Sequence, residues 1–224
     1  MKIPAESSIA VGKPPVFIMR AAIIVILRIV QAGWSRARAM TDVVKPDGFE
    51  VPMTHCLREG MLEALFADRH PWRTKMMIAP GTETFSPCIP HRPSGLSDIA
   101  VYLYVYTRLG DHDPQAIIEC KRIAGSDAEL CRFYVQRGID RFKIGQYASR
   151  HAVGFMVGYV ISGNEAAAAT GINGYLEREN RLADRLCFPG LVEHPGVWRS
   201  RHIRSAPSAP IELHHQLLPI AEAE

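Results

Sequence analysis

The sequence lacks the glycine-rich and serine-centred patterns on which many enzymes depend. Neither GxxxxGK[ST] nor GxGxxG occurs in the 224 residues, and GxSxG is also absent. The first two patterns cradle phosphate groups in glycine-rich loops, and the third places a nucleophilic serine on a strained turn. Nucleotide-driven chemistry and a serine-elbow hydrolase are therefore poor interpretations of this chain.

Cysteine is scarce and scattered. No CxxC pair occurs, and the spacing of the five cysteines does not match that of zinc ligands. An odd, dispersed set indicates reduced thiols, so we expect a cytoplasmic protein. The five are Cys56, Cys88, Cys120, Cys131 and Cys187.

A long uninterrupted apolar run is also missing. Residues 16–30 are apolar, but Arg20 and Arg28 interrupt them, and a spanning helix needs about 20 apolar residues. Basic residues follow this segment, whereas a secretory signal carries them in front. Apolar side chains at helical spacing predict an amphipathic helix to about residue 40, which docks on the body of the protein or on a second subunit. Peripheral membrane association is the alternative, and we expect no stable membrane insertion.

The charge is nearly balanced, with 26 basic and 23 acidic residues and a net charge of +3. This mild excess is compatible with a nucleic-acid partner but does not require one. Hydrophobic residues make up 47% and charged residues 22%, which is typical of a folded globular chain. We expect an N-terminal arm and amphipathic helix (1–40), followed by one domain (41–224) that ends in a β-hairpin extension.

The order of the predicted elements indicates the fold class. A helix over 48–68, with Asp47 as its N-cap, precedes a strand over 74–79 and a loop over 80–95. Strands over 98–107 and 116–123 then form an antiparallel hairpin. A helix over 127–149 capped by Ser126, a buried strand over 154–161, a helix over 164–186 and a hairpin of 198–203 with 211–217 complete the chain. This order predicts an α/β fold with a mixed central sheet flanked by helices.

Three charged residues fall on the predicted central hairpin. Asp98 begins the first strand, and Glu119 and Lys121 lie two apart on the second, so both project from one face. Charged side chains on an otherwise apolar strand are costly unless they are paired or bind metal. Two carboxylates suit Mg²⁺ or Mn²⁺, and Lys121 could orient a water for phosphodiester hydrolysis. A structural ion pair, Glu119 with Lys121 or Asp98 with Arg122, is the alternative.

The segments GLSDIAVYLYVYT and AIIECKRI resemble the PD-(D/E)xK nuclease superfamily over roughly residues 48–161. The resemblance implies a restriction-endonuclease-like fold, with Asp98 and Glu119 as metal ligands and Lys121 as the motif lysine. Ser97 stands where that motif often has proline. The resemblance further implies DNA as the substrate, a role in restriction, defence or repair, and a homodimer for duplex cleavage.

Further site residues are less sharply defined. Members of that superfamily often add an acid from the preceding helix, and Glu50 is favoured here over Glu59 and Glu63, although Asp47 with Glu50 also fits a capping box. On the helix after the second strand, Arg141 and Lys143 could contact DNA phosphates or belong to a solvated face.

The histidines near the C-terminus favour surface hydrogen bonding or a subunit contact over catalysis, because they lack a metal-ligand spacing such as HExxH. They are His194, His202, His214 and His215. The main alternative for the whole chain is a catalytically inactive nuclease-fold module that binds nucleic acid or protein.

Overall fold

The computed structural model describes residues 16–67, 70–85, 93–104, 113–204 and 210–221. Its main feature is a six-stranded mixed sheet in the order β1-β4-β5-β6-β8-β7, which confirms the predicted α/β fold class. The arm over 1–15, positions 105–107 of the predicted strand and Cys88 lie outside the described residues. The strands are β1 (Met76–Pro80), β4 (Ile99–Leu103), β5 (Ala116–Ala124), β6 (Val153–Ser162), β7 (Val197–His202) and β8 (Ile211–Pro219).

The strands at the centre of the sheet run parallel and those at its edges antiparallel. β5 pairs with β6 and β6 with β8 in parallel, whereas β1 with β4, β4 with β5 and β7 with β8 are antiparallel. The predicted hairpin of the two charged strands is thus confirmed as the β4–β5 pair. The late hairpin is confirmed as β7–β8, and it extends the sheet because β8 lies beside β6.

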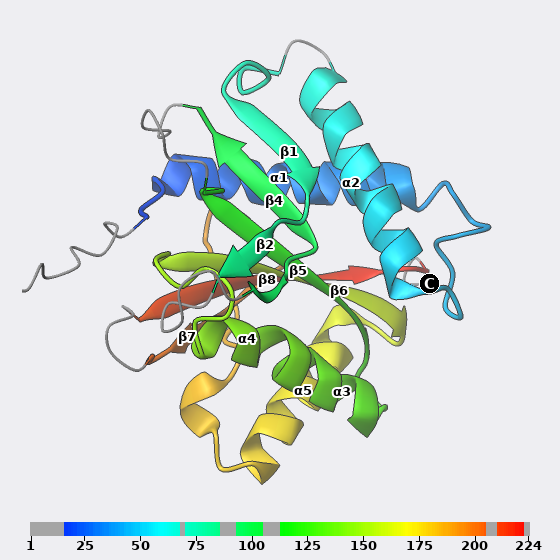
Figure 1. The fold of residues 1–224 in the computed structure, drawn as a ribbon. Coiled ribbons are helices and arrows are strands. Elements are labelled where there is room, and N and C mark those ends of the chain that lie inside the picture. Colours follow the sequence, from blue (N-terminus) through cyan, green and yellow to red (C-terminus); the bar gives the residue numbers. More distant parts are fainter. Residues whose placement is uncertain (1–15, 68–69, 86–92, 105–112, 205–209, 222–224) are drawn as a thin grey trace, which may run out of the picture.

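Helices cover both faces of this sheet (Figure 1). α1 (Arg20–Ala37) and α2 (Glu50–Phe66) lie on one face, and α3 (Ala128–Tyr134), α4 (Asp140–Lys143) and α5 (Glu165–Arg178) lie on the other. Alternate side chains of β5 divide between the two layers: Ile118 joins the core under α1 and α2, and Ile117 and Ile123 join the core under α3–α5. Positions 119 and 121 of β5 therefore face the α3–α5 layer.

The N-terminal helix is a core element, so of the two predicted docking partners, the body of the protein and a second subunit, the structure shows the first. Ile26, Leu27 and Val30 are each 1% exposed. Trp34 Nε1 donates a hydrogen bond to Pro219 O of β8 at 2.9 Å, so polar as well as apolar contacts hold the helix in place. Among the helices that the structure describes, none combines the length and hydropathy that crossing a membrane requires.

The predicted helix starts are corrected by the structure. α2 begins at Glu50 with Phe49 as its N-cap and no side-chain cap, so the prediction of Asp47 was wrong. A turn in which Gly48 N donates to Lys45 O separates Asp47 from the helix. The next helix is capped by Asp127, whose carboxylate accepts from two amides of the first turn, rather than by the adjacent Ser126.

Other element boundaries also differ from the prediction. The helix expected over 127–149 consists of α3, the π-helical segment η2 (Val135–Ile139) and α4, and Gly145 at φ 74° follows its end. The loop expected over 80–95 contains two short paired strands, β2 (Glu83–Phe85) and β3 (Pro93–Leu96). The helix expected over 164–186 ends at Arg178 and is followed by the 3₁₀ turn η3 (Leu182–Asp184).

Candidate active site

The candidate site lies where β5 continues past the start of β4. The pairing of β4 with β5 ends at Ile118. Beyond Ile118, two carboxylates accept hydrogen bonds from the backbone amides on the same edge of β5. Cys120 N donates to Asp98 Oδ2 at 2.7 Å, and Arg122 N donates to Glu50 Oε2 at 3.0 Å. Because the two amides are two residues apart, they point to the same side of the strand. The backbone of β5 therefore positions both acids.

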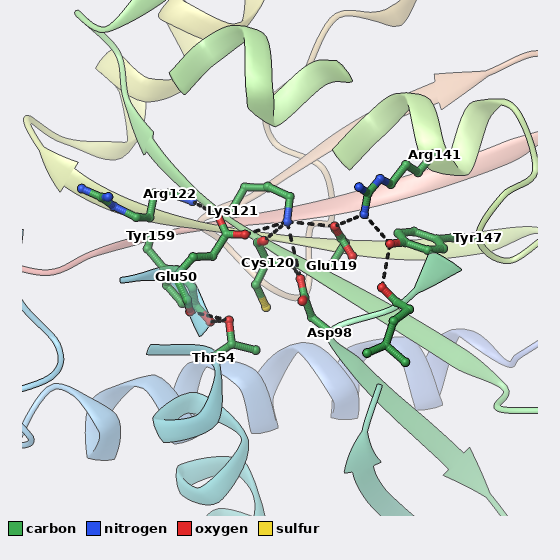
Figure 2. Close-up of polar contacts among 11 residues, drawn as sticks. Glu50, Thr54, Asp98, Glu119, Cys120, Lys121, Arg122, Arg141, Tyr147 and Tyr159 are labelled. Carbon is green, nitrogen blue, oxygen red and sulfur yellow. Dashed lines mark hydrogen bonds and ion pairs between the residues drawn. The ribbon is translucent and has the colours of Figure 1, made fainter. Parts of the chain in front are cut away.

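The Lys121 ammonium lies at the centre of these groups (Figure 2). Its Nζ is 2.8 Å from Glu119 Oε1, 2.9 Å from Glu50 Oε1 and 3.7 Å from Asp98 Oδ2, and it donates to Cys120 O at 2.6 Å. Burial by itself would lower the pKa of Lys121, but the nearby carboxylates outweigh burial and raise it above its ordinary value. The structure thus brings Asp98, Glu119 and Lys121 together with Glu50, the acid that the sequence favoured on the preceding helix.

Glu119 forms the buried floor of the site. Its side chain is 1% exposed, whereas those of Asp98 and Glu50 are 25% and 32% exposed. Burial raises the pKa of Glu119 to about 8, and Lys121 opposes that rise only in part. Glu119 Oε2 is buried and has no hydrogen-bond partner among the described residues. Burial thus disfavours the charged form of Glu119, and a cation beside the carboxylate favours it.

Glu50 is the one of the three predicted candidates on α2 whose carboxylate reaches β5. Its two carboxylate oxygens bond Lys121 and the amide of Arg122, so the capping-box interpretation was wrong. Glu59 Oε1 instead accepts a hydrogen bond from Arg58 Nη2 at 2.7 Å, and Glu63 Oε2 lies 3.8 Å from Arg36 Nε. An acid at the first turn of α2 thus connects two elements that lie far apart in the sequence.

Arg141 supplies a second cation at the rim of the site. Its Nη1 lies 3.5 Å from Glu119 Oε1 and donates to the hydroxyl of Tyr147, which donates to Leu96 O at 2.7 Å (Figure 2). The guanidinium-bearing side chain is 33% exposed, so it can meet a ligand from solvent. Burial, together with the charge of Glu119, raises the pKa of Tyr147 to about 12 and keeps the hydroxyl protonated. Tyr147 was not predicted as a site residue.

The π-helical segment brings the helix layer close to the site. At Gly138 a Cβ would lie 2.5 Å from Met156 Cε and 3.6 Å from Lys121 Cγ, so the helix passes close to the strands there. A π turn holds one more residue than an α turn and is often found at functional sites. α4 follows η2 directly, and Arg141 of α4 reaches Glu119.

Lys143, which was predicted beside Arg141 as a nucleic-acid contact, has a different environment. Its Nζ lies 2.6 Å from Asp184 Oδ2, and Arg181 Nε lies 2.9 Å from the same oxygen. Arg181 also donates to both carboxylate oxygens of Asp140. One ion pair thus connects the Lys143 end of α4 to η3, and another connects the Asp140 end to Arg181, the residue before η3. Arg141 lies between these two anchored ends.

A buried polar chain extends from Asp184 into the sheet. His202 Nδ1 lies 2.9 Å from Asp184 Oδ1, Ser200 Oγ lies 2.7 Å from His202 Nε2 and 2.8 Å from His215 Nε2, and His215 Nδ1 lies 3.0 Å from Tyr134 Oη. Both imidazoles are fully buried and His214 of the same strand as His215 is 1% exposed, so the prediction of surface or subunit contacts was wrong for these three histidines. Ser200 is 2% exposed and already bridges two rings, which indicates a structural role for the chain.

The residues present fit a hard divalent cation in their chemistry. Asp98 and Glu119 offer carboxylate oxygens, and the buried Oε2 of Glu119 is an acceptor for which the described residues supply no donor. A closed set of three or more His, Cys, Asp and Glu side chains that could hold a metal is not found in the described part of the chain. Asp98 and Glu119 would supply two carboxylate ligands to such a cation, and other oxygens, such as water, would complete its coordination.

Comparisons with protein-family models, with curated proteins and with solved structures found no match to this chain.

Proposed function

We propose that this protein is a Mg²⁺- or Mn²⁺-dependent nuclease that hydrolyses phosphodiester bonds of DNA at the site around Lys121. The observation that carries the proposal is the convergence of three carboxylates and an ammonium on the open edge of β5. Two of the carboxylates are solvent-accessible, and the third is buried with one oxygen without a hydrogen-bond partner among the described residues.

Each side chain has a role that follows from its place. Asp98 and Glu119 would hold the metal, which when bound lowers the pKa of a water and neutralises charge on the phosphate. Lys121 orients the attacking water and stabilises the charge that develops on the phosphate oxygens. Arg141, exposed at the rim, positions the scissile phosphate. Glu50 completes the arrangement by bonding Lys121.

The resemblance to the PD-(D/E)xK nuclease superfamily supports this proposal. The motif residues Asp98, Glu119 and Lys121 lie at the start of one strand and on the next, as the resemblance implies. The order α2, β1, β4, β5, α3 and β6 is compatible with a restriction-endonuclease-like fold. DNA as substrate, a homodimer for duplex cleavage and a cytoplasmic location with reduced thiols belong to the same proposal, together with a role in restriction, defence or repair.

Cleavage assays test the proposal. Plasmid and single-stranded DNA are incubated with the full chain and Mg²⁺, Mn²⁺ or EDTA. We expect cleavage with either metal, none with EDTA, and a loss of at least about a hundredfold for Asp98→Asn and Lys121→Met. Lys75→Met removes an exposed lysine and serves as the matched control, and circular dichroism checks folding.

A second candidate function is a nucleic-acid or protein-binding module without catalysis. The observation that favours it is the engagement of Lys121 Nζ by four oxygens, which is also what a structural ion-pair cluster requires. Metal-independent DNA retention in a gel-shift assay, with no cleavage under any condition, would establish this module and exclude the nuclease. Cleavage that Asp98→Asn and Lys121→Met leave unchanged would instead place the activity elsewhere.

A further inference from the structure

We infer that the Lys121 ammonium is an internal cation that competes with a divalent metal ion for Glu119, and that Glu50 is the partner that retains the ammonium when it gives up Glu119. The inference rests on the proposed function and concerns the regulation of the same site. It gives the metal-free protein a defined resting state.

The first step is the environment of Nζ. Oxygens of Glu119, Glu50 and Cys120 lie 2.8, 2.9 and 2.6 Å from it, and Asp98 Oδ2 lies at 3.7 Å. An ammonium group has three donors, and Glu119, Glu50 and Cys120 can take all three. In the metal-free protein the ammonium is therefore surrounded by oxygen atoms, as a bound metal ion would be.

The second step concerns repulsion. A divalent ion that binds the carboxylate of Glu119 arrives within a few ångströms of Nζ, because Nζ lies 2.8 Å from Glu119 Oε1. The Lys121 side chain is 10% exposed and that of Glu119 is 1% exposed, so water screens this repulsion weakly. Metal binding is consequently weaker than it would be without the charge of Lys121.

The third step assigns Glu50. It lies on α2, across the open edge of β5 from the Glu119 face, and its Oε2 is held by the Arg122 amide at 3.0 Å. Its other oxygen lies 2.9 Å from Nζ, a contact that does not depend on Glu119. Lysine has a flexible stem of four carbons, so the ammonium can shift toward Glu50 without a change in the backbone. Glu50 thereby lowers the cost of metal entry without binding the metal.

Isothermal titration of Mn²⁺ alone into the full-length chain, without DNA, measures the competition directly. Lys121→Met keeps the length of the stem and removes the charge, and we expect it to bind Mn²⁺ roughly tenfold more tightly than the wild type. Lys75→Met should bind as the wild type does. Lys121→Gln replaces the methionine variant if thermal melting shows that the latter does not fold.

A double-mutant cycle tests the role of Glu50. Glu50→Gln should weaken Mn²⁺ binding in the wild-type background and have little effect in the Lys121→Met background. An equal loss in both backgrounds would make Glu50 a metal ligand and overturn its assignment here. Folded Lys121→Met that binds Mn²⁺ no more tightly than the wild type would overturn the competition, while metal-dependent cleavage by the wild type would still support the nuclease. If neither wild type nor variants bind Mn²⁺ and no DNA is cleaved, both proposals fail.

Discussion

Substitution of Glu119 by glutamine should remove a specific dependence of stability on pH. Burial raises the pKa of Glu119 from its ordinary value of 4.5 to about 8. Between these two values the native state binds more protons than the unfolded chain. The free energy of unfolding of the metal-free wild type should therefore fall as pH rises through this window, by the linkage relation.

The size of the effect follows from the same shift. A rise from 4.5 to about 8 corresponds to an upper limit of roughly 5 kcal/mol, at about 1.4 kcal/mol for each pKa unit. Lys121 and Arg141 adjust to the charge of Glu119, so we expect a few kcal/mol in practice. The side-chain amide of Glu119→Gln does not titrate, so the variant should keep a neutral side chain at position 119 at high pH as well as at low pH.

Urea unfolding in EDTA at pH values between 5 and 9 measures this difference for wild type and Glu119→Gln. The stability of the variant relative to the wild type should increase as pH rises, and the increase should level off above about pH 8. Subtraction of the two curves removes the titration of the remaining groups. Parallel curves across the whole range would refute the reasoning that burial raises the pKa of Glu119.

Three further predictions concern the surrounding structure. Gly60→Ala should lower the free energy of unfolding by about 1–3 kcal/mol or more, because the new Cβ would lie 2.3 Å from the backbone oxygen of Gly33 in α1. Urea titrations measure this loss, and an unchanged unfolding midpoint would contradict the close contact between the two helices. Arg181→Met removes the ion pair that anchors the Asp140 end of α4, so kinetic assays should show a fall in DNA cleavage of about fivefold or more through Arg141, with Mn²⁺ affinity unchanged. Burial lowers the pKa of His151 to about 4, so the free energy of unfolding should fall by up to roughly 3 kcal/mol as pH falls from about 6.5 to 4. In acid-unfolding curves, His151→Gln should show a smaller loss of stability over this range.

Local pattern in the sequence accounts for the sheet and for the core of the candidate site. The apolar sequences of β5 and β6 predict buried strands, and both are central strands of the sheet. The two-residue spacing of Glu119 and Lys121 predicts a common face, and their polar atoms lie 2.8 Å apart. Asp98, at the start of the preceding strand, lies within reach of both because the strands form an antiparallel pair.

The remaining features depend on contacts between distant segments. Glu50 is 71 residues from Lys121, and its bond to the Arg122 amide exists because β4 starts too late to pair with that part of β5. Arg141 lies on α4 directly after the π-helical segment, and no local pattern in the helix reveals that its side chain reaches Glu119.

The sequence by itself therefore determined the fold class, the docked N-terminal helix and the trio of Asp98, Glu119 and Lys121, because period-two and helical spacing are local properties of the chain. Only the tertiary structure decided that Glu50, which the sequence favoured over Glu59 and Glu63, reaches this trio and that Arg141 lies beside Glu119. It also decided that His202 and His215 are buried in a polar chain instead of lying on the surface. The physical reason is that a charged or polar side chain takes its partner from whichever segment packs beside it, and that choice is made by the assembly of the whole core.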